Sequence, residues 1–347
     1  MKKYLNKIIG GHDLTADEAA EVTRLIMTGK VTDAEISDFL VALSEKGEAI
    51  EEIVGMVKVM REQMNQVEVA GRPCLPMPTG RQAAGRLLDT CGTGGDGVGT
   101  INVSTAAAIV CAAAGAKVAK HGNRAASSQS GSADVLEALG VKVDLGTQQV
   151  KKCIEEVGIG FMFAPNFHPA MKYVMPARKA LGIRTIFNFL GPLSNPAGAQ
   201  YQVIGVSQAD MAAKLGQALM ELGSEKVIIV NSDDGLDEVS VSAPTQVYEF
   251  AKGQEVKKYK IEPAKFYNID EVKGGTAEEN AQDIKDIFAG KLTGAKKDIV
   301  VANAAMGLLA YEMADSYQKC RVKAEEVIED GQAAAKLAQW VEVSNKL

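Results

Sequence analysis

Apolar residues in the first 65 positions recur every three or four residues, which is the spacing of amphipathic helices. Two runs of this kind hold Ile36, Phe39, Leu40 and Leu43, and then Ile50, Ile53, Val54 and Val57. Two helices are expected to open with a capping box, in which a Thr and a Glu three residues later satisfy each other's free amides, at Thr15/Glu18 and Thr32/Glu35. We therefore predict three short helices, each with one face to bury against the rest of the chain or a second subunit.

The pattern changes after a proline-containing stretch from Gly71 to Gly80, which predicts a linker. Short apolar segments then alternate with helical stretches, which is typical of a mostly parallel sheet flanked by helices. The predicted strands contain Leu87-Leu88, Val118-Ala119, Phe161–Phe163, Tyr201–Val206 and Val227–Val230. The predicted fold class is α/β, with a small N-terminal helical domain (residues 1–72) and a larger α/β domain (residues 73–347) that has a mostly parallel central sheet.

The second half of the chain carries three further apolar runs with no helix between them, which predicts an antiparallel extension of the sheet. These runs are Val239–Val241, Val247–Phe250 and Val256–Ile261. A third capping box, Thr276/Glu279, predicts the helix over 276–289. Residues 169–182 are expected to be helical and residues 184–196 to be rich in turns, and we expect the segment from about 169 to 195 to join the helical domain.

Composition excludes several classes of protein. The 347 residues carry a formal net charge of -6 with a sequence pI of about 5.4, so no overall basic field attracts nucleic acid or an anionic membrane. Five scattered cysteines without CxxC spacing suggest neither a disulfide framework nor a zinc site. We therefore expect a cytoplasmic protein with no nucleic-acid or membrane partner, in which any phosphate site is local.

A glycine-rich stretch over residues 89–105 lies between a predicted strand and an Ala-rich helix. Glycines let main-chain amides approach an anion, and the start of the helix, residues 102–105, adds free amides and a favourable dipole. The stretch also matches the weak dinucleotide fingerprint Gly-x-Gly-x-x-Gly. That alternative needs an acidic residue at the end of the next strand, and here this strand ends in Lys120-His121. A Walker lysine is also missing, so we predict a phosphate site of another kind.

A second polar segment, residues 120–128, follows the next predicted strand and leads to a helix whose predicted N-cap is Ser132. The ends of parallel strands meet at one edge of a sheet. This segment should therefore face the same crevice as the glycine-rich stretch after the preceding strand, which we call the glycine loop. The alternative for His121 is a turn or core histidine with satisfied hydrogen bonds. For Lys120 and Arg124 the alternative is a solvated surface pair.

An acidic turn, Asp233-Asp234-Gly235-Leu236-Asp237-Glu238, follows a third predicted strand. Gly235 allows a change of chain direction that brings Asp237 and Glu238 onto one ion. Carboxylate oxygens suit Mg²⁺, which keeps several waters and shares a substrate's phosphates. The alternative is an acidic surface turn, and the alternating ligands of an EF-hand are missing.

These segments together resemble the anthranilate phosphoribosyltransferases over essentially the whole chain. The shared motifs, in order, are Gly92-Thr-Gly-Gly-Asp96, Asn102-Val-Ser-Thr105, Lys120-His-Gly-Asn-Arg124, Ser130-Gly-Ser-Ala-Asp134, Gly191-Pro-Leu193 and Gly235-Leu-Asp-Glu238. Each motif is weak alone, whereas their order and spacing are specific. Two positions depart from the family pattern: Asn231-Ser232 stands where many relatives have His-Gly, and Glu35 stands where Gln is usual.

The resemblance implies Mg²⁺-dependent transfer of a phosphoribosyl group from phosphoribosyl pyrophosphate (PRPP) to anthranilate through an oxocarbenium-like state, with no side chain acting as general acid or base. It implies Mg²⁺ binding by Ser104, Asp237 and Glu238, and anthranilate binding by Gly92, Asn123 and Arg178, the last being otherwise interpretable as a surface charge on a helix. The implied PRPP-binding residues are Gly92, Gly95, Asp96, Thr100, Asn102, Val103, Ser104, Thr105, Lys120, His121, Gly122, Asn123, Arg124, Ala125, Ala126, Ser127, Ser128 and Ser132.

The family pattern also implies a homodimer formed through the N-terminal helices. Two other functions stay open from the sequence. A pyrimidine nucleoside phosphorylase shares the fold, although its own motifs are not found here. A non-catalytic relative that binds nucleic acid should be basic and should lack the acidic pair, and this chain shows neither feature.

Overall fold

The computed structural model of the protein describes residues 1–69, 85–125 and 129–347. The expected linker at Gly71–Gly80 and the expected domain boundary at residue 72 lie outside the described residues, as do Ala126, Ser127 and Ser128.

The N-terminal segment folds into four helices and not three. They are α1 (Lys2–Ile9), α2 (Ala16–Met27), α3 (Asp33–Lys46) and α4 (Ile50–Glu62). The capping boxes at Thr15/Glu18 and Thr32/Glu35 are confirmed, since in each the Thr side chain accepts from the Glu amide and the Glu side chain accepts from the Thr amide. The sequence pattern does not predict α1, because this helix has no capping side chain and buries only Tyr4 and Ile8 of its eight residues.

The predicted sheet is confirmed. Seven strands pair in the order β3-β2-β1-β4-β5-β6-β7 among the described residues. Strands β3, β2, β1, β4 and β5 are parallel, and β6 and β7 are antiparallel to their neighbours. The strands are β1 (Leu88–Gly92), β2 (Val118–Gly122), β3 (Ile159–Phe163), β4 (Tyr201–Gly205), β5 (Lys226–Ser232), β6 (Thr245–Ala251) and β7 (Lys257–Ile261).

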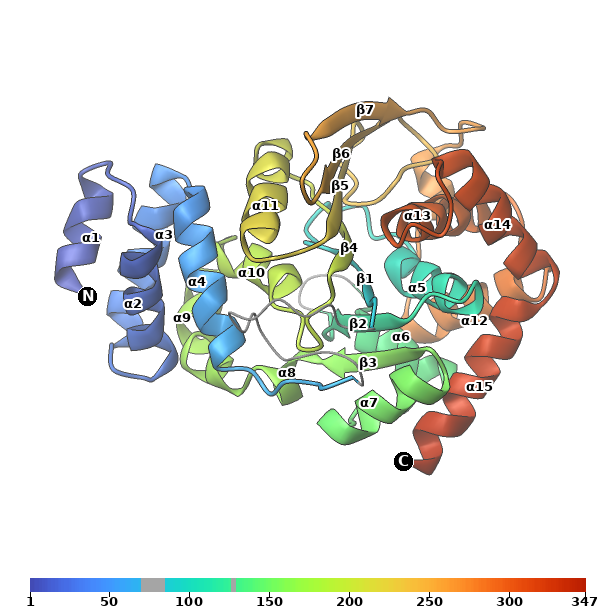
Figure 1. The fold of residues 1–347 in the computed structure, drawn as a ribbon, viewed down its shortest axis with the longest axis horizontal. Coiled ribbons are helices and arrows are strands. Elements are labelled where there is room, and N and C mark those ends of the chain that lie inside the picture. The colour runs from blue at the N-terminus through green and yellow to red at the C-terminus, as the bar shows by residue number, and fades with distance from the viewer. Residues whose placement is uncertain (70–84, 126–128) are drawn as a thin grey trace.

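Helices cover both faces of this sheet, as Figure 1 shows. One face shares a hydrophobic core with α5 (Val103–Ala113), α6 (Ser132–Leu139), α12 (Ala277–Phe288), α13 (Ala295–Ala310), α14 (Tyr317–Glu329) and α15 (Gln332–Lys346). The other face shares a core with α11 (Ala209–Glu221), α10 (Phe187–Leu193) and the N-terminal helices. The alternation of strand side chains produces the two cores: Ile228 and Val230 face the first, whereas Val227 and Ile229 face the second.

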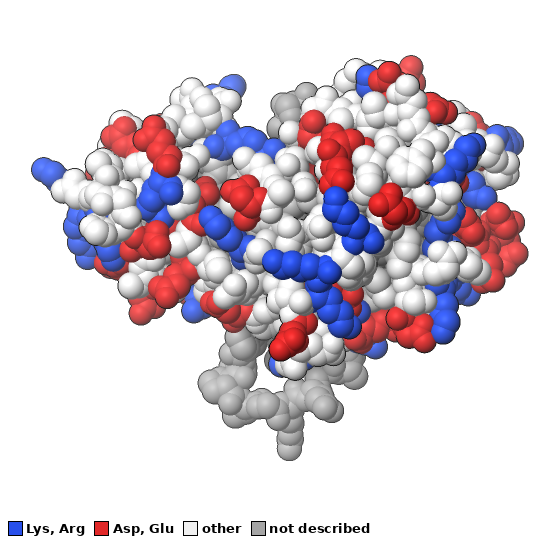
Figure 2. Space-filling model, turned by 90° about the horizontal axis from the view of Figure 1, so that it is seen from above, with Lys and Arg blue, Asp and Glu red and all other residues white. Residues whose placement is uncertain are grey.

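The remaining elements connect these layers. They are α7 (Thr147–Glu156), α8 (Ala164–Phe167), the 3₁₀ helices η1 (Pro169–Tyr173) and η2 (Ile269–Val272), and α9 (Met175–Leu181). Elements η1, α9 and α10 pack against α2, α3 and α4, respectively, so a segment from the middle of the chain lies beside the N-terminal bundle. No helix of the described ranges has the length and apolar character that a bilayer crossing needs. Acidic and basic side chains are interspersed on the face shown in Figure 2.

Two local predictions are wrong. Val239–Val241 is not a strand. The side chain of Asn303 on α13 makes the hydrogen bonds that a neighbouring strand would make: it accepts from the amide of Val239 at 2.8 Å and donates to the carbonyl of Val239 at 3.0 Å. Residues 187–193 form α10 and not a turn-rich stretch, although Pro192 lies inside the helix. The apolar face of α10, which buries Phe187 and Leu190, outweighs the turn residues.

Candidate functional site

The glycine loop leaves the carboxyl end of β1 at the point where the strand order reverses, with β2 on one side and β4 on the other. Open α/β sheets bind ligands in the crevice at such a switch point. Gly94, Gly95, Gly97 and Gly99 have φ values of 70°, 78°, 74° and 72°. Side chains with a Cβ rarely adopt this conformation, so the sequence of the loop is set by its backbone path.

Main-chain hydrogen bonds fix both ends of the glycine loop. At its start, the amide of Thr93 donates to the carbonyl of Gly205 at the end of β4, at 2.9 Å. At its end, the amide of Ile101 donates to the carbonyl of Val272 at 3.1 Å. Between them, the amide of Val98 donates to a carboxylate oxygen of Asp96 at 3.1 Å. Few bonds hold the segment between these ends, where an anion would meet free amides.

The acidic turn meets the glycine loop directly. The amide of Gly94 donates to Oδ2 of Asp237 at 2.6 Å. A Cβ built on Gly92 would overlap with the same carboxylate, so the residue that ends β1 has to be a glycine for Asp237 to lie there. Gly235, with a φ of 88°, allows the turn that carries Asp237 from the end of β5 to this position.

Burial and neighbouring negative charge both raise the pKa values of the acidic pair, Asp237 and Glu238. Burial, and then the negative charge of Asp96, raise the pKa of Asp237 to about 7. Burial, and then the charge of Asp237, raise the pKa of Glu238 well above its usual range, while Lys120 and a hydrogen bond with the backbone of Ser104 oppose this shift. The structure therefore brings the predicted metal ligands Ser104, Asp237 and Glu238 together.

The donor set fits a hard divalent cation. Two carboxylates and a serine supply oxygen atoms only, which are the ligands of Mg²⁺. A third carboxylate, Asp96, lies close enough to Asp237 to shift its pKa. The described residues nevertheless contain no group of three or more His, Cys, Asp or Glu side chains arranged to hold a metal ion. A cation at this place would relieve the repulsion between the buried carboxylates.

Lys120 lies below the crevice and is not on the surface. Its side chain is buried, and Nζ donates to the carbonyl of Thr90 at 2.7 Å and to Oγ of Ser104 at 3.3 Å. Burial lowers its pKa, and the negative charge of Asp89 opposes that shift. The interpretation as a solvated surface cation is therefore wrong for Lys120, whose ammonium group joins β1 to the start of α5.

Arg124 lies on the surface, as its alternative interpretation expected. Its guanidinium pairs with Asp134 at 2.9 Å and with Glu137 at 2.6 Å, both on α6. Ser132 is the first residue of α6 and not its N-cap, which is Gly131. The free amides there are taken by the carboxylate of Asp134, which accepts from Gly131 and from Ala125, each at 2.9 Å.

Asn102 joins the start of α5 to two distant segments. Its Nδ2 donates to the carbonyl of Ser130 at 3.1 Å, and its Oδ1 accepts from Nδ2 of the buried Asn280 on α12 at 2.9 Å. Next to it, Thr100 forms an isolated antiparallel β-bridge with Lys273.

Asn123 is exposed, and its Oδ1 accepts a hydrogen bond from the amide of Arg124 at 2.8 Å. The predicted residues Val103 and Thr105 are buried in α5, and a Cβ on Gly122 would meet Ser132.

A buried polar layer lies beneath β1 and β2, and two of its members, Asn195 and His168, stand in no sequence motif. Asp89 accepts from Nδ2 of Asn195 at 2.7 Å and from the amide of His121 at 3.3 Å, and burial raises its pKa to about 6. The rings of His121 and His168 are 4.9 Å apart, and burial lowers the pKa of His168 to about 4 and that of His121 well below its usual range. Both imidazoles are therefore neutral near pH 7.

Two arginines follow each other along the segment after η1, and they lie in different surroundings. Arg178 on α9 is half-buried, and its Nη1 lies 4.0 Å from Sδ of Met175. Burial lowers its pKa, and no contact described in the structure joins it to the glycine loop. Arg184, which the sequence did not single out, reaches that loop: its Nη1 lies 3.4 Å from the carbonyl oxygen of Gly95.

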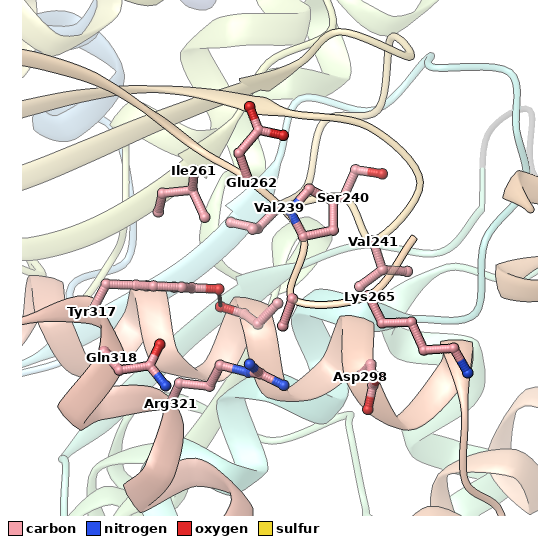
Figure 3. A pocket seen from close by; sticks show the side chains of 13 residues that line it. Val239, Ser240, Val241, Ile261, Glu262, Lys265, Asp298, Tyr317, Gln318 and Arg321 are labelled. Atoms are coloured by element: carbon pink, nitrogen blue, oxygen red, sulfur yellow. Dashed lines mark hydrogen bonds between the residues drawn. The ribbon is translucent and has the colours of Figure 1, made fainter. Parts of the chain in front are cut away.

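A small cavity of about 180 Å³ lies beyond the acidic turn, on the side of α13 and α14 (Figure 3). Residues 239–241, which continue the turn, form one wall, and Asp298 and Arg321 lie on the opposite helices. These charged groups already have partners, since Asp298 accepts from the hydroxyl of Tyr267 at 2.7 Å and Arg321 pairs with Glu325 at 3.1 Å. None of the residues that line the cavity belongs to the glycine loop.

Similarity to known proteins agrees with this geometry. Residues 84–334 match the family model described as "Glycosyl transferase family, a/b domain", and residues 2–64 match "Glycosyl transferase family, helical bundle domain". The anthranilate phosphoribosyltransferase of Herpetosiphon aurantiacus is 47% identical over 337 residues, which are 96% of either chain.

Solved structures show the same likeness. The crystal structure of anthranilate phosphoribosyltransferase from Thermus thermophilus superposes with a TM-score of 0.88 at 41% identity, over 98% of this chain and 99% of that one. The Saccharomyces cerevisiae enzyme in complex with PRPP and Mg superposes with a TM-score of 0.87 at 28% identity, over 99% and 98% of the two chains.

Proposed function

Because the chain belongs to the anthranilate phosphoribosyltransferase family, we propose that it transfers the 5-phosphoribosyl group of PRPP to the amine of anthranilate and releases pyrophosphate. The observation that carries the proposal is the contact between Gly94 and Asp237, which brings the glycine loop and the acidic turn together, while the hydrogen bond from the backbone of Ser104 to Glu238 adds the start of α5. A pyrophosphorylated sugar needs these features together: free amides, a helix start and oxygen ligands for a cation.

Ser104, Asp237 and Glu238 would hold the Mg²⁺ ion. When bound, the ion would neutralise the charge that develops on the departing pyrophosphate. The Saccharomyces cerevisiae relative was solved in complex with PRPP and Mg, which supports Mg²⁺ as the ion. Lys120 adds a fixed positive charge below the same place through its contacts with Thr90 and Ser104.

The glycine loop and the segment after β2 would bind PRPP. The residues proposed to contact it are Gly92, Gly95, Asp96, Thr100, Asn102, Val103, Ser104, Thr105, Lys120, His121, Gly122, Asn123, Arg124, Ala125, Ala126, Ser127, Ser128 and Ser132. Asn102 and Lys120 have the most support, because hydrogen bonds to Asn280 and to the carbonyl of Thr90 hold them in place. Arg124 would have to exchange its ion pairs with Asp134 and Glu137 to take part.

Gly92, Asn123 and Arg178 are proposed to bind anthranilate, whose carboxylate suits a guanidinium. An arylamine is neutral near pH 7 and needs no base to become nucleophilic. The protein would therefore act by positioning the two substrates, by excluding water and by stabilising charge.

We also propose that the chain is a cytoplasmic homodimer that associates through its N-terminal helices and does not bind nucleic acid. Large apolar side chains are exposed on this side of the molecule: Ile9 is 68% exposed, Met175 49% and Ile183 51%. Apolar surface of this kind often marks an interface between subunits. Analytical ultracentrifugation would test the dimer, and Ile9→Glu should shift it toward monomer.

The decisive experiment follows the fluorescence of anthranilate after the purified protein is mixed with PRPP and Mg²⁺. We expect fluorescence to fall only when all three components are present, and EDTA to stop the reaction. A wild-type protein that leaves anthranilate unchanged under these conditions would refute the proposal. Phosphorolysis of uridine or thymidine in a parallel assay would instead favour the nucleoside phosphorylase, and salt-dependent binding of single-stranded DNA or RNA the non-catalytic relative.

A further inference from the structure

Arg184 joins three segments at the crevice, although no motif points to it. It lies in the connection between α9 and α10, and its Nη1 donates to Oγ of Ser207 at 2.9 Å and lies 3.4 Å from the carbonyl of Gly95. Ser207 follows β4, and its hydroxyl in turn lies 3.5 Å from the carbonyl of Gly94. One guanidinium thus contacts the glycine loop and the segment after β4 from the side of the helical layer.

Glycine at position 95 is a condition for this contact. A Cβ built there would overlap with Nη1 of Arg184, and the φ of 78° already disfavours a side chain. The ring of Phe189 lies 5.6 Å from the guanidinium carbon and covers another side of the group. The arginine is therefore held in place by its surroundings and does not extend into solvent.

Among the residues that the structure describes, none pairs with the other edge of the guanidinium. Nε and Nη2 of Arg184 are buried and make no hydrogen bond with any residue in the described ranges. These two nitrogens form the side edge of the group, whose parallel N–H bonds match two oxygens of a carboxylate or a phosphate. Buried donors of this kind are nearly always satisfied, because a charged donor without a partner is costly.

We propose that Arg184 is a substrate-binding residue of this site, and that its Nε–Nη2 edge binds an oxyanion of a substrate held at the glycine loop. The proposal rests on the function proposed above, in which both substrates carry such groups: phosphates on PRPP and a carboxylate on anthranilate. Nη1 lies against the carbonyl of Gly95, so the guanidinium is next to the glycine loop. Ser207 and Gly95 hold Nη1 and so orient the edge.

Two variants test the assignment. Arg184→Lys keeps the positive charge and one donor for Ser207 but has no side edge, and Arg184→Gln removes the charge as well. The matched control is Arg321→Lys on α14, which makes the same replacement in an ion pair with Glu325 away from the glycine loop. Steady-state kinetics give KM for each substrate and kcat, and calorimetry gives the affinity for inorganic pyrophosphate without turnover.

We expect both Arg184 variants to raise one KM on the order of tenfold or more, with a smaller change in kcat, while Arg321→Lys behaves as wild type. A higher KM for PRPP together with weaker pyrophosphate binding identifies a phosphate as the oxyanion, and a higher KM for anthranilate alone identifies the carboxylate. Unchanged KM values for both substrates in Arg184→Lys would overturn the assignment. If Arg184→Gln does not fold, the lysine variant alone decides.

The two proposals fail in different ways. If the wild-type protein consumes no anthranilate, the transferase function fails whatever the variants show. If the wild type is active and Arg184→Lys matches it in both KM values and in pyrophosphate affinity, only the role of Arg184 fails.

Discussion

Oδ2 of Asp237 accepts a hydrogen bond from the amide of Gly94 at 2.6 Å, although the two residues are 143 positions apart in the chain. The bond joins the turn after β5 to the loop after β1, with β4 between the two strands. A carboxylate held by a main-chain amide keeps a fixed direction, so Asp237 has a fixed position relative to the loop whose amides we propose to bind phosphate.

Replacing Asp237 by Asn should remove most of the metal-dependent turnover. The amide has nearly the same size and still accepts from Gly94, but it loses the charge that a Mg²⁺ ion requires. We expect kcat to fall on the order of a hundredfold, with little change in the binding of anthranilate.

The control is Asp233→Asn in the same turn, where the carboxylate is exposed and pairs with Lys260. This variant should keep its activity, because exposed ion pairs contribute little. Full turnover of Asp237→Asn at saturating Mg²⁺ would contradict the metal assignment.

Adding one methyl group at Gly92 should displace the acidic pair without unfolding the protein. Its backbone does not lie in the left-handed region, so alanine fits the chain, but the new Cβ would occupy the place of the Asp237 carboxylate. Because a displacement of about 1 Å can cost a factor of a hundred, we expect a loss of that order in kcat.

Gly146→Ala is the matched control, since a Cβ there meets only Oε1 of Gln149 at 3.6 Å, which is an ordinary contact. Circular dichroism should show the same melting temperature for both variants within a few degrees. If Gly92→Ala kept wild-type kcat, the close approach of Asp237 would not matter for the reaction.

Much of the fold follows from local sequence patterns. The three capping boxes and the alternation of apolar segments identify helices and strands because these signals depend on neighbours in the chain. Val239–Val241 looked like a strand for the same reason, and its main-chain groups are instead taken by Asn303, 64 positions away. Contacts over such distances leave no periodic trace in a sequence.

The site could be predicted in part for a similar reason. The residues that end strands β1, β2 and β5 stand in recognisable motifs, and the order of parallel strands brings them to one edge. Arg184 and His168 have no motif of their own, and their importance comes from burial beside other polar groups. The missing signal is three-dimensional: a buried polar atom that has no partner or only a distant one.

His168 should make the protein less stable in acid. Burial lowers its folded pKa to about 4, below the usual 6.5, so the unfolded chain binds more protons between these two values. Its contribution to stability is complete above about pH 6.5 and is lost as the pH falls toward 4; for a shift of this size the loss between pH 7 and pH 5 is about 2 kcal/mol.

Asp89 acts in the opposite direction, because its raised pKa of about 6 favours the folded state in acid. The free energy of unfolding, measured in urea at pH 7 and at pH 5, should be compared between the wild type and His168→Gln. The difference between the two proteins isolates the contribution of His168 from that of Asp89. The variant should lose less stability on acidification than the wild type, whereas His12→Gln, at an exposed position, should match the wild type. An equal loss in all three proteins would show that His168 is not responsible.

Asn303 should support catalysis from outside the crevice. Its buried amide donates to the carbonyl of Val239 at 3.0 Å and accepts from the amide of Val239 at 2.8 Å, one residue after Glu238. Asn303→Leu has a similar volume but leaves both main-chain groups unsatisfied, which should lower the free energy of unfolding by about 2 to 4 kcal/mol. The turn that carries Asp237 and Glu238 would then lose its fixed position, so kcat should fall and the Mg²⁺ concentration needed for half-maximal rate should rise.

The control is Asn345→Leu, at an exposed position near the C-terminus, which should change neither kcat nor the Mg²⁺ requirement. Titration of the rate with Mg²⁺ at a temperature where both variants are folded distinguishes a weakened metal site from simple unfolding, and an unchanged Mg²⁺ requirement in Asn303→Leu would mean that the turn holds its ligands without this side chain.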